Sequence, residues 1–557
     1  MASLHFKGKS AVWNHHLSVP YHTLEKDKDV SLKGNDDSEN LIIEGDNLLA
    51  LKALLPKYQG EVKCIYIDPP YNTGNEEWVY NDNVNNPLIK SWLGEVVGKE
   101  GEDFTRHDKW LCMMTPRLKL LRDLLSEDGV IFVSVDDNEL YRLKNLMDEI
   151  FEEQNFLGNF IVNSTPNARD YGHVGKMHEY CLFYSKNILD TETEKLLDEE
   201  KTFKYKDENS EFNIHPLYNS NVAFHNKNRP NLYYPFYLDT NSKNGDFYSI
   251  SLEKLNDSVE IFPPKSQKEG IQFVWRWGKK LSKKELNKEI VGYKTDSGEF
   301  RIVQKMRTTN KIIRSLLLDK AFTSRRGTAQ VEELFGKKVF DFPKPVELIK
   351  TFIKISSDED SIILDSFAGS GTTAQAVMEL NRKDGKNRKF ILIQIPEKIN
   401  EGKPAYEAGY RYVHEITHER VKRVIKRDKL ETGFSYFKLG SAIDAENMLS
   451  GNLPTYNEFA KYVYYLASGQ ALENEKTIRE KDFYVGSFNN ESIYLLYNDD
   501  IEELKKLAIT LDWVKKAHEK DSGRKVIYAP ACYLDEEYLA QFNIFFVGIP
   551  YNLFERS

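Results

Sequence analysis

Four consecutive residues, Asp68-Pro69-Pro70-Tyr71, have the side chains needed to activate an amine attached to an aromatic ring. The lone pair of such an amine is delocalised into the ring, so the nitrogen becomes nucleophilic only when acceptors on its hydrogens favour a pyramidal geometry. The Asp68 carboxylate can be one acceptor, and the Pro69 carbonyl in the stiff Pro-Pro turn can be the other. Tyr71 offers a flat face on which a base lifted from a duplex can stack. A strand that ends in a proline turn with a buried tyrosine is the structural alternative.

A second group of residues can bind a nucleotide-like ligand. It consists of Asp365, Ser366, Phe367, Ala368, Gly369, Ser370, Gly371, Thr372 and Thr373. Glycines let the backbone approach a ligand closely, and the N-terminus of a following helix can receive a carboxylate. The spacing also fits a loose dinucleotide fingerprint, but the lysine of a phosphate-binding P-loop is absent. Serine, threonine and phenylalanine suit a zwitterionic amino acid joined to adenosine, and a plain tight turn is the alternative.

Strands alternating with helices must position both groups. Apolar strands are expected at residues 41–44, 62–68, 128–137, 176–186, 361–367 and 389–395, and helices at 47–55, 110–125, 346–355 and 374–380. Such alternation predicts a mostly parallel α/β sheet. Each group begins at the end of a strand, and the carboxyl ends of strands are where such sheets bind ligands.

The alternation is interrupted once, which predicts the domain organisation. We expect an N-terminal arm (1–40), an α/β domain in two halves (41–186 and 336–429), an insertion between the halves (187–335), and a small C-terminal α/β domain (430–557). In the last, strands at 491–497, 525–530 and 542–549 are expected, with a helix over 501–517 between the first two.

The charge is distributed unevenly. The net charge is −9, yet residues 265–326 hold 17 Lys or Arg against 6 Asp or Glu, a local charge of +11, which leaves −20 for the rest. Such a segment can be a phosphate-binding surface or simply a solvated helical face. The four cysteines are scattered, so neither a disulfide nor a metal site is expected. The polar start and the lack of a long apolar run predict a cytoplasmic protein with no membrane association.

The two motifs together resemble the β-class DNA amino-methyltransferases, in which Asp-Pro-Pro-Tyr is catalytic and Phe-x-Gly-x-Gly binds S-adenosylmethionine (SAM). Flanking stretches resemble the modification (Mod) subunits of Type III restriction–modification systems. They are Glu44-Gly45-Asp46-Asn47, Asn72-Thr73-Gly74, Tyr80-Asn81-Asp82, Val135-Asp136-Asp137, Arg229-Pro230-Asn231, Trp275-Arg276-Trp277-Gly278 and Phe342-Pro343-Lys344-Pro345. The resemblance implies a SAM-dependent methyltransferase (Rossmann-like) domain with circularly permuted motif order, interrupted by a target-recognition insertion.

The resemblance also implies roles for single residues. Asp46 would bond the cofactor's adenine amine, the stretch with Pro343, Lys344 and Glu347 would line its methionine end beside Phe367, and Asp365 would lie near its ammonium. The turn residues Gly369, Ser370, Gly371, Thr372 and Thr373 would also bind the cofactor. Many relatives place an acidic residue where Gln394 stands, so both Gln394 and Glu397 are candidates for the ribose. Arg276, Arg325 and Arg326 are candidates for DNA contacts.

The expected reaction is direct methylation of the N6 amine of adenine in duplex DNA. Asp rather than Ser before Pro-Pro-Tyr favours adenine, although the N4 amine of cytosine stays open. Methylation at carbon 5 of cytosine would need a cysteine after proline, and none follows a proline here. A separate restriction subunit and a homodimer are expected partners. The alternatives are an orphan methyltransferase, an enzyme acting on RNA or a protein amide, and an NAD(P)-dependent oxidoreductase.

Overall fold

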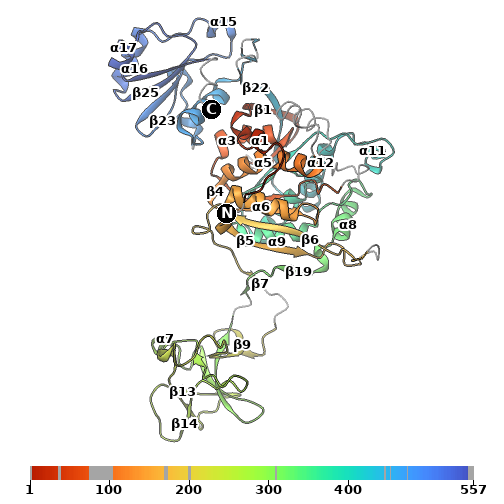
Figure 1. Ribbon diagram of the computed structural model, residues 1–557, viewed down its shortest axis with the longest axis vertical. Helices are drawn as coiled ribbons and strands as arrows, with labels where there is room; N and C mark the ends of the chain where they lie inside the picture. The colour runs from red at the N-terminus through yellow and green to blue at the C-terminus, as the bar shows by residue number, and fades with distance from the viewer. Residues whose placement is uncertain are drawn as a thin grey trace. The chain divides into compact units, whose positions relative to one another are not determined.

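The structure is a computed structural model of the 557-residue chain. It describes residues 3–34, 39–73, 105–167, 173–197, 202–307, 310–444, 447–448, 450–451, 453–472 and 474–549. The chain divides into two compact units, which are Met1–Glu194 with Ile313–Ser557, and Lys195–Ile312 (Figure 1). The first unit contains both motifs.

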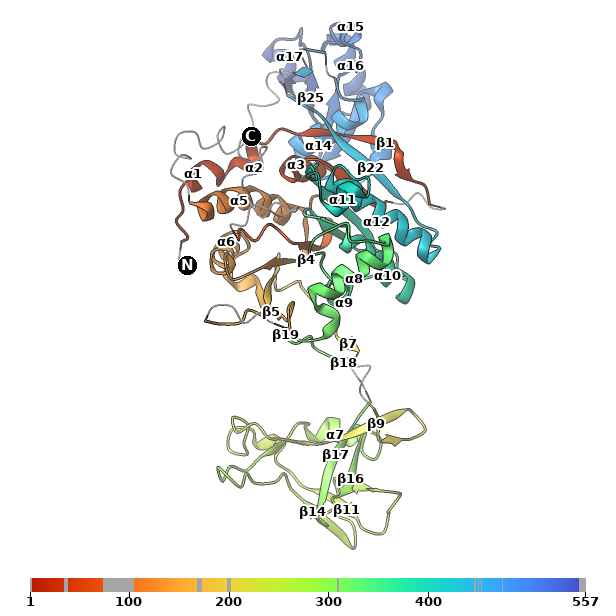
Figure 2. The same ribbon diagram turned by 90° about the vertical axis from the view of Figure 1, so that its right-hand side faces the viewer.

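A ten-stranded sheet is the scaffold of the first unit (Figure 2). In spatial order its strands are β1 (His22–Leu32), β22 (Phe434–Ala442), β2 (Leu41–Glu44), β21 (Lys389–Gln394), β20 (Ile362–Asp365), β3 (Val62–Ile67), β4 (Leu125–Val135), β6 (Glu179–Ser185), β5 (Phe156–Val162) and β19 (Leu316–Leu317). The run from β22 to β4 is parallel throughout, whereas β1 and β6 are antiparallel to their neighbours. The predicted mostly parallel α/β sheet is confirmed.

Both faces of the central strands are covered, which explains their nearly continuous apolar sequences. On one face, Ile65 and Ile67 of β3 pack in a core that includes helices α3 (Asn47–Tyr58), α5 (Arg106–Leu124) and α6 (Leu140–Phe151). On the other face, the ring of Phe132 stacks on Phe352 of α9 (Val346–Ser356) at a centroid distance of 4.6 Å. Helices α10 (Thr372–Asp384) and α12 (Val413–Asp428) follow beside α9.

The edge of the sheet differs from the predicted segment boundaries. β1 comes from the segment expected to be an arm and pairs antiparallel with β22, which comes from the segment expected to start the C-terminal domain. Edge strands leave one side open to water, so β1 carries many charged residues and its sequence does not look like a core strand. The β1–β22 pair therefore extends the sheet beyond the expected 41–186 and 336–429.

The second unit contains small antiparallel sheets rather than an α/β arrangement. Its elements are β7 (Leu196–Leu197), β8 (Tyr205–Lys206), β9 (Glu211–Pro216), β10 (Tyr218–Asn219), β11 (Phe236–Asp239), β12 (Phe247–Tyr248), β13 (Ile250–Ser251), β14 (Ser258–Ile261), β15 (Val274–Trp275), α7 (Lys279–Glu285), β16 (Ile290–Lys294), β17 (Phe300–Met306) and β18 (Asn310–Lys311). An aromatic core that includes Tyr234, Phe236 and Trp275 holds it together. These bounds lie inside the expected insertion of residues 187–335.

The C-terminal residues form a four-stranded sheet in the order β23 (Tyr484–Phe488), β24 (Glu491–Leu495), β25 (Arg524–Ala529) and β26 (Ile544–Gly548). Within the first unit, helix α14 (Tyr456–Ser468) packs between this sheet and helix α3, and Tyr462 of α14 stacks on Tyr21 at 4.6 Å. The single helix expected over 501–517 is two helices, α15 (Ile501–Leu504) and α16 (Leu511–Lys520), with α17 (Glu536–Gln541) further on. Between α15 and α16, Ile509 forms a parallel bridge with Cys532, and the Thr510 hydroxyl caps the start of α16.

The remaining helices of the first unit are short or lie at its surface. They are α1 (Lys9–Val12), α2 (His15–Ser18), α8 (Ser324–Phe335) and α11 (Pro404–Glu407). Among the helices of the described residues, none has the length and apolar character needed to cross a membrane.

Candidate active site

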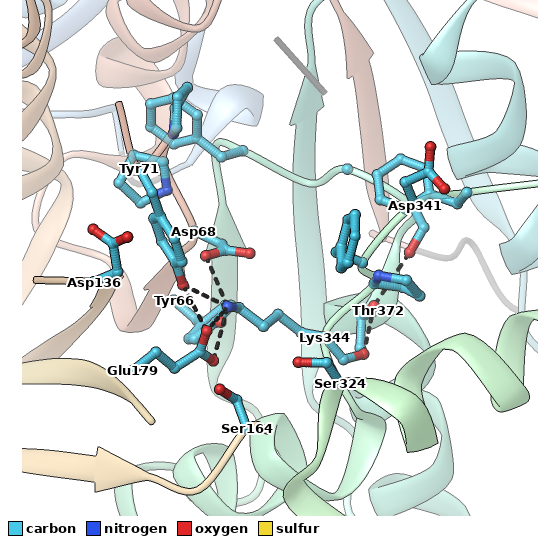
Figure 3. Close-up of a pocket in the computed structure, with 18 of the residues that line it drawn as sticks. Tyr66, Asp68, Tyr71, Asp136, Ser164, Glu179, Ser324, Asp341, Lys344 and Thr372 are labelled. Carbon is cyan, nitrogen blue, oxygen red and sulfur yellow. Dashed lines mark hydrogen bonds and ion pairs between the residues drawn. The ribbon is translucent and has the colours of Figure 1, made fainter. Parts of the chain in front are cut away.

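The two motifs meet at one edge of the sheet. β3 and β20 pair in parallel, with Leu364 beside Ile65, so Asp68 directly after β3 and Asp365 at the end of β20 share that edge. A pocket of about 390 Å³ opens there (Figure 3). Its lining includes Tyr66, Asp68, Pro69, Pro70, Tyr71, Thr73, Asp136, Asp137, Ser164, Thr165, Lys176, His178, Glu179, Ser324, Phe340, Asp341, Phe342, Pro343, Lys344, Asp365, Phe367, Ala368, Gly369, Ser370, Thr372 and Thr373.

The Asp-Pro-Pro-Tyr turn is anchored from behind. The indole N–H of Trp110 on α5 donates to the Pro70 carbonyl at 2.6 Å. Asn72 is buried with φ 57°, a left-handed conformation that asparagine tolerates, and its amide donates to the Arg106 carbonyl at 3.1 Å and to Glu139. These contacts fix the backbone of the turn while its side chains face the pocket.

One cation is shared by three groups of the pocket. Lys344 Nζ lies 3.3 Å from Asp68 Oδ1 and 2.9 Å from both carboxylate oxygens of Glu179 (Figure 3). It also donates to the hydroxyl of Tyr71, which in turn donates to Glu179 Oε2 at 3.2 Å. Lys344 therefore faces the predicted catalytic carboxylate, although the resemblance assigned it to the cofactor.

Burial and charge oppose each other in this cluster. Burial raises the pKa of Asp68, the negative charge of Glu179 raises it further, and Lys344 lowers it. For Lys344, burial alone would lower the pKa, but the carboxylates of Asp68 and Glu179 more than offset this and raise it. The pKa of the lysine is thus raised and its charge is favoured, whereas the pKa of Asp68 stays above its ordinary value in spite of the nearby cation.

The second motif forms a tight turn around a buried carboxylate. Asp365 is only 3% exposed, and it accepts hydrogen bonds from the Thr373 hydroxyl at 2.5 Å and from the Phe367 N–H at 3.0 Å. Burial raises its pKa to about 7, against the effect of both hydrogen bonds. Gly371 has φ 82°, and a Cβ there would lie 3.0 Å from the Thr417 carbonyl, so this position requires glycine.

Residues of helix α12 that the sequence analysis did not predict hold the glycine turn in place through hydrogen bonds. Arg420 on α12 is fully buried and donates to the hydroxyls of Ser370 at 2.6 Å and Thr372 at 2.8 Å. Burial lowers the pKa of Arg420 to about 9. Thr417 donates to the Gly369 carbonyl at 2.6 Å. A helix about fifty residues downstream carries no local sequence signal for such contacts.

Five predicted cofactor residues are outside the pocket lining, and one of them, Gly371, belongs to the glycine turn itself. Asp46 caps α3 through the Leu48 N–H at 2.8 Å and forms an ion pair with Arg117 at 3.2 Å. Gln394 accepts from the Gly369 N–H at 2.7 Å, a contact that orients the turn. Glu347 pairs with Lys350 at 2.7 Å, and Glu397 is half-buried further along the chain; these two, with Asp46 and Gln394, stay untested as cofactor contacts.

The three arginines proposed for DNA contacts are all exposed. Arg325 and Arg326 lie in the first turn of α8, directly after Ser324 of the pocket lining, and Arg326 pairs with Glu333 at 3.2 Å. Arg276 belongs to the second unit and precedes α7. The stretch 80–82 lies outside the described residues. In the described part of the chain, no group of three His, Cys, Asp or Glu could hold a metal ion.

Comparison with known sequences defines the class of protein. The profile of the N6_N4_Mtase family, described as DNA methylase, matches residues 62–403. The match covers more than half of the chain and includes both motifs. The chain therefore belongs to the DNA methylase family.

Individual relatives extend this assignment. The chain is 37% identical over 421 residues to the Type III restriction–modification enzyme EcoPI Mod subunit of Escherichia phage P1, covering 71% of this chain and 63% of that protein. It is 33% identical to the Type II methyltransferase M.KpnI of Klebsiella pneumoniae, and this match covers 70% of this chain and 88% of that protein. Among solved structures, the PvuII DNA methyltransferase (cytosine-N4-specific) matches 70% of this chain and 95% of its own at 12% identity with a TM-score of 0.32, too low for any conclusion. The predicted resemblance to DNA amino-methyltransferases and Type III Mod subunits is confirmed, and the chain spans somewhat less than two thirds of the Mod subunit.

Proposed function

We propose that the chain transfers the methyl group of SAM to the N6 amine of adenine in duplex DNA, as the modification and recognition subunit of a Type III restriction–modification system. The observation that carries this proposal is that a single pocket contains Asp68 and Tyr71 beside Asp365 and the glycine turn. Membership of the DNA methylase family and the names of the relatives support it.

The residues of the pocket fit SAM. The glycine turn leaves room for close approach at the start of α10, Phe367 offers an apolar contact, and the buried carboxylate of Asp365 suits an ammonium group. SAM supplies an electrophilic methyl group attached to a sulfonium sulfur. The cofactor would bind at the β20 side of the pocket and the target base at the β3 side.

The chain's own residues then act on the amine. Asp68 Oδ1 is buried and contacts the Lys344 ammonium at 3.3 Å, and the carboxylate has further acceptor capacity for an amine hydrogen. The Pro69 carbonyl accepts the other, and the base stacks on Tyr71. The amine nitrogen bonds to the methyl carbon as the bond to sulfur breaks, and Asp68 is placed to take the proton that the amine loses. Alignment and charge stabilisation supply the rate enhancement.

Alternatives differ in the base and in the partners. The aspartate at the head of the motif favours adenine, and methylation of the cytosine N4 amine is the alternative that keeps the same mechanism. Membership of the DNA methylase family removes the oxidoreductase alternative. We further propose a homodimer that binds a restriction subunit, with an orphan methyltransferase as the alternative.

The test is long-read sequencing of genomic DNA from a methylation-deficient host that expresses the chain. The wild-type chain should mark adenine in one short sequence motif, and Asp68→Ala should abolish the marks. Asp128→Ala is the matched control, because Asp128 lies on the neighbouring strand β4 outside the pocket and pairs with Lys63. Methyl marks on cytosine would replace adenine by cytosine as the proposed target base. If a folded, SAM-binding protein leaves no marks, the proposal that this chain methylates DNA without a partner is refuted.

A further inference from the structure

The ammonium group of Lys344 lies where it can control the charge of Asp68. We propose that Lys344, held by Glu179, is a positioning residue that keeps the Asp68 carboxylate ionised and able to accept the amine of the target base. This inference rests on the proposed function, because it concerns the carboxylate on which that reaction depends.

The geometry shows an unequal sharing of the ammonium. Glu179 contacts Nζ of Lys344 with both oxygens at 2.9 Å, whereas Asp68 contacts it through one oxygen at 3.3 Å. Tyr71 fixes Glu179 through its hydroxyl. When an amine approaches Asp68, Lys344 can therefore stay bound to Glu179, so that the amine does not have to displace the cation from its strongest partner.

The cation is needed because Asp68 is buried. A protonated carboxyl group has lost part of its capacity to accept hydrogen bonds and cannot accept a proton from the methylated amine. Burial favours that protonated form, and an opposite charge within about 4–6 Å typically lowers an aspartate pKa by about 1–3 units. Lys344 is only 12% exposed, so solvent screens its charge little.

Other titratable groups also face Asp68. They are Tyr66 on β3, Tyr71 in the turn, Glu179 and Cys181 on β6, Lys344 before α9 and Asp365 on β20, with Asp136, Asp137, Lys176 and His178 further along the pocket wall. Burial raises the pKa values of Tyr66, Tyr71 and Cys181, which are therefore neutral between pH 5 and 9. Each variant described below keeps all of these titratable groups apart from the one or two that it replaces.

The first test is the pH dependence of single-turnover methyl transfer at saturating SAM. Compared with wild type, Lys344→Met should move the acid limb upward by about 1–3 pH units and recover much of its rate at pH 9. The acid limb of the double variant Lys344→Met/Glu179→Gln should lie between those of wild type and Lys344→Met. The double variant also lacks the negative charge of Glu179, which raises the pKa of Asp68. Lys63→Met is the matched control: Lys63 is a shielded lysine at the opposite end of β3, paired with Asp128.

The second test needs neither DNA nor SAM. In Lys344→Met two carboxylates are buried without their cation, so they take up a proton as the pH falls. The deficit in melting temperature of Lys344→Met relative to wild type should therefore shrink between pH 8 and pH 5.5, whereas the deficit of Lys63→Met should stay constant. Linkage requires this sign, since a folded-state pKa raised above the unfolded value costs stability progressively as the pH rises from the unfolded to the folded pKa, and the cost is regained as the pH falls.

The outcomes separate the inference from the function. A parallel loss of rate at all pH values in Lys344→Met, or a deficit in melting temperature that does not change with pH, would mean a purely steric role and overturn the inference. If the wild-type protein transfers no methyl group to DNA while the melting data behave as expected, the proposed function fails, and the role of Lys344 in catalysis fails with it.

Discussion

Binding of SAM should depend steeply on pH through Asp365. Burial raises the pKa of its carboxyl group to about 7, and the proposed function puts this carboxylate beside the cofactor's ammonium, which needs the ionised form. Lowering the pH from 7.5 to 5.5 should therefore weaken binding about 25-fold, and binding at pH 6 should release about 0.9 proton.

Isothermal titration calorimetry with S-adenosylhomocysteine, in two buffers of different ionisation enthalpy, measures both quantities. Asp365→Asn keeps the size of the side chain and an acceptor for Phe367 N–H but has no titratable proton. The variant should bind more weakly at pH 7.5 and show no proton release. A wild-type dissociation constant that is constant between pH 5.5 and 7.5, or an Asp365→Asn variant that keeps the slope, would refute the reasoning.

The ligand-free protein gives an independent check on the same group. The unfolded pKa of an aspartate is near 3.9 and the folded pKa of Asp365 is about 7, so between these values the folded state holds a proton that the unfolded state does not. Stability contributed by this proton is lost as the pH rises through 7. The melting temperature of wild type should fall between pH 6 and pH 8 more than that of Asp365→Asn.

Two further predictions concern the catalytic turn and the second unit. Trp110→Phe removes the N–H that holds the Pro70 carbonyl, so the free energy of unfolding measured in urea should fall by about 1–2 kcal/mol. The rate of methyl transfer should also fall while SAM affinity stays unchanged. An unchanged free energy of unfolding would contradict the anchoring role. Lys280→Ala and Lys283→Ala each remove an exposed lysine of α7. If these lysines contact phosphates, each change should reduce the slope of log affinity against log salt concentration by about 0.9, as measured by fluorescence anisotropy of labelled DNA. An unaltered slope would exclude α7 from the DNA-binding surface.

The sequence predicts the part of the site that depends on local patterns. Asp68 and Asp365 each end an apolar strand, and parallel strands put their carboxyl ends at one edge, so their presence in one pocket follows from the strand pattern. The direction in which Lys344 points does not follow, because it depends on Glu179 of β6, a strand that is distant in sequence and adjacent in space. A motif gives the neighbours of a residue in the chain, whereas the charge partner is set by packing.

Buried polar supports are missed for the same reason. Arg420 has no motif of its own, and a helical arginine in a sequence is normally taken as a surface residue. Its burial is offset by the hydrogen bonds that Ser370 and Thr372 of the turn and Gln375 of α10 accept from it. The edge strand β1 is missed because half of it faces water, which gives its residues the composition of a loop.

The strand order explains how a unit of more than one hundred residues can interrupt this site without disturbing it. β20 enters the sheet between β21 and β3 only after the second unit has been completed. The two ends of that unit are paired with each other, with Leu196 opposite Lys311 and Leu197 opposite Asn310 in the antiparallel β7–β18 pair. Because the ends already lie together, a short linker can close the chain at little entropic cost.

We therefore expect that replacing residues 198–309 by a short Gly-Ser linker leaves a folded protein. It should bind SAM as tightly as the full chain in calorimetry, since every residue of the pocket lining belongs to the first unit. It should no longer methylate a specific DNA sequence if the second unit provides recognition. A deletion variant that unfolds would show that the sheet depends on the second unit, and one that still methylates the same motif would move recognition to the first unit.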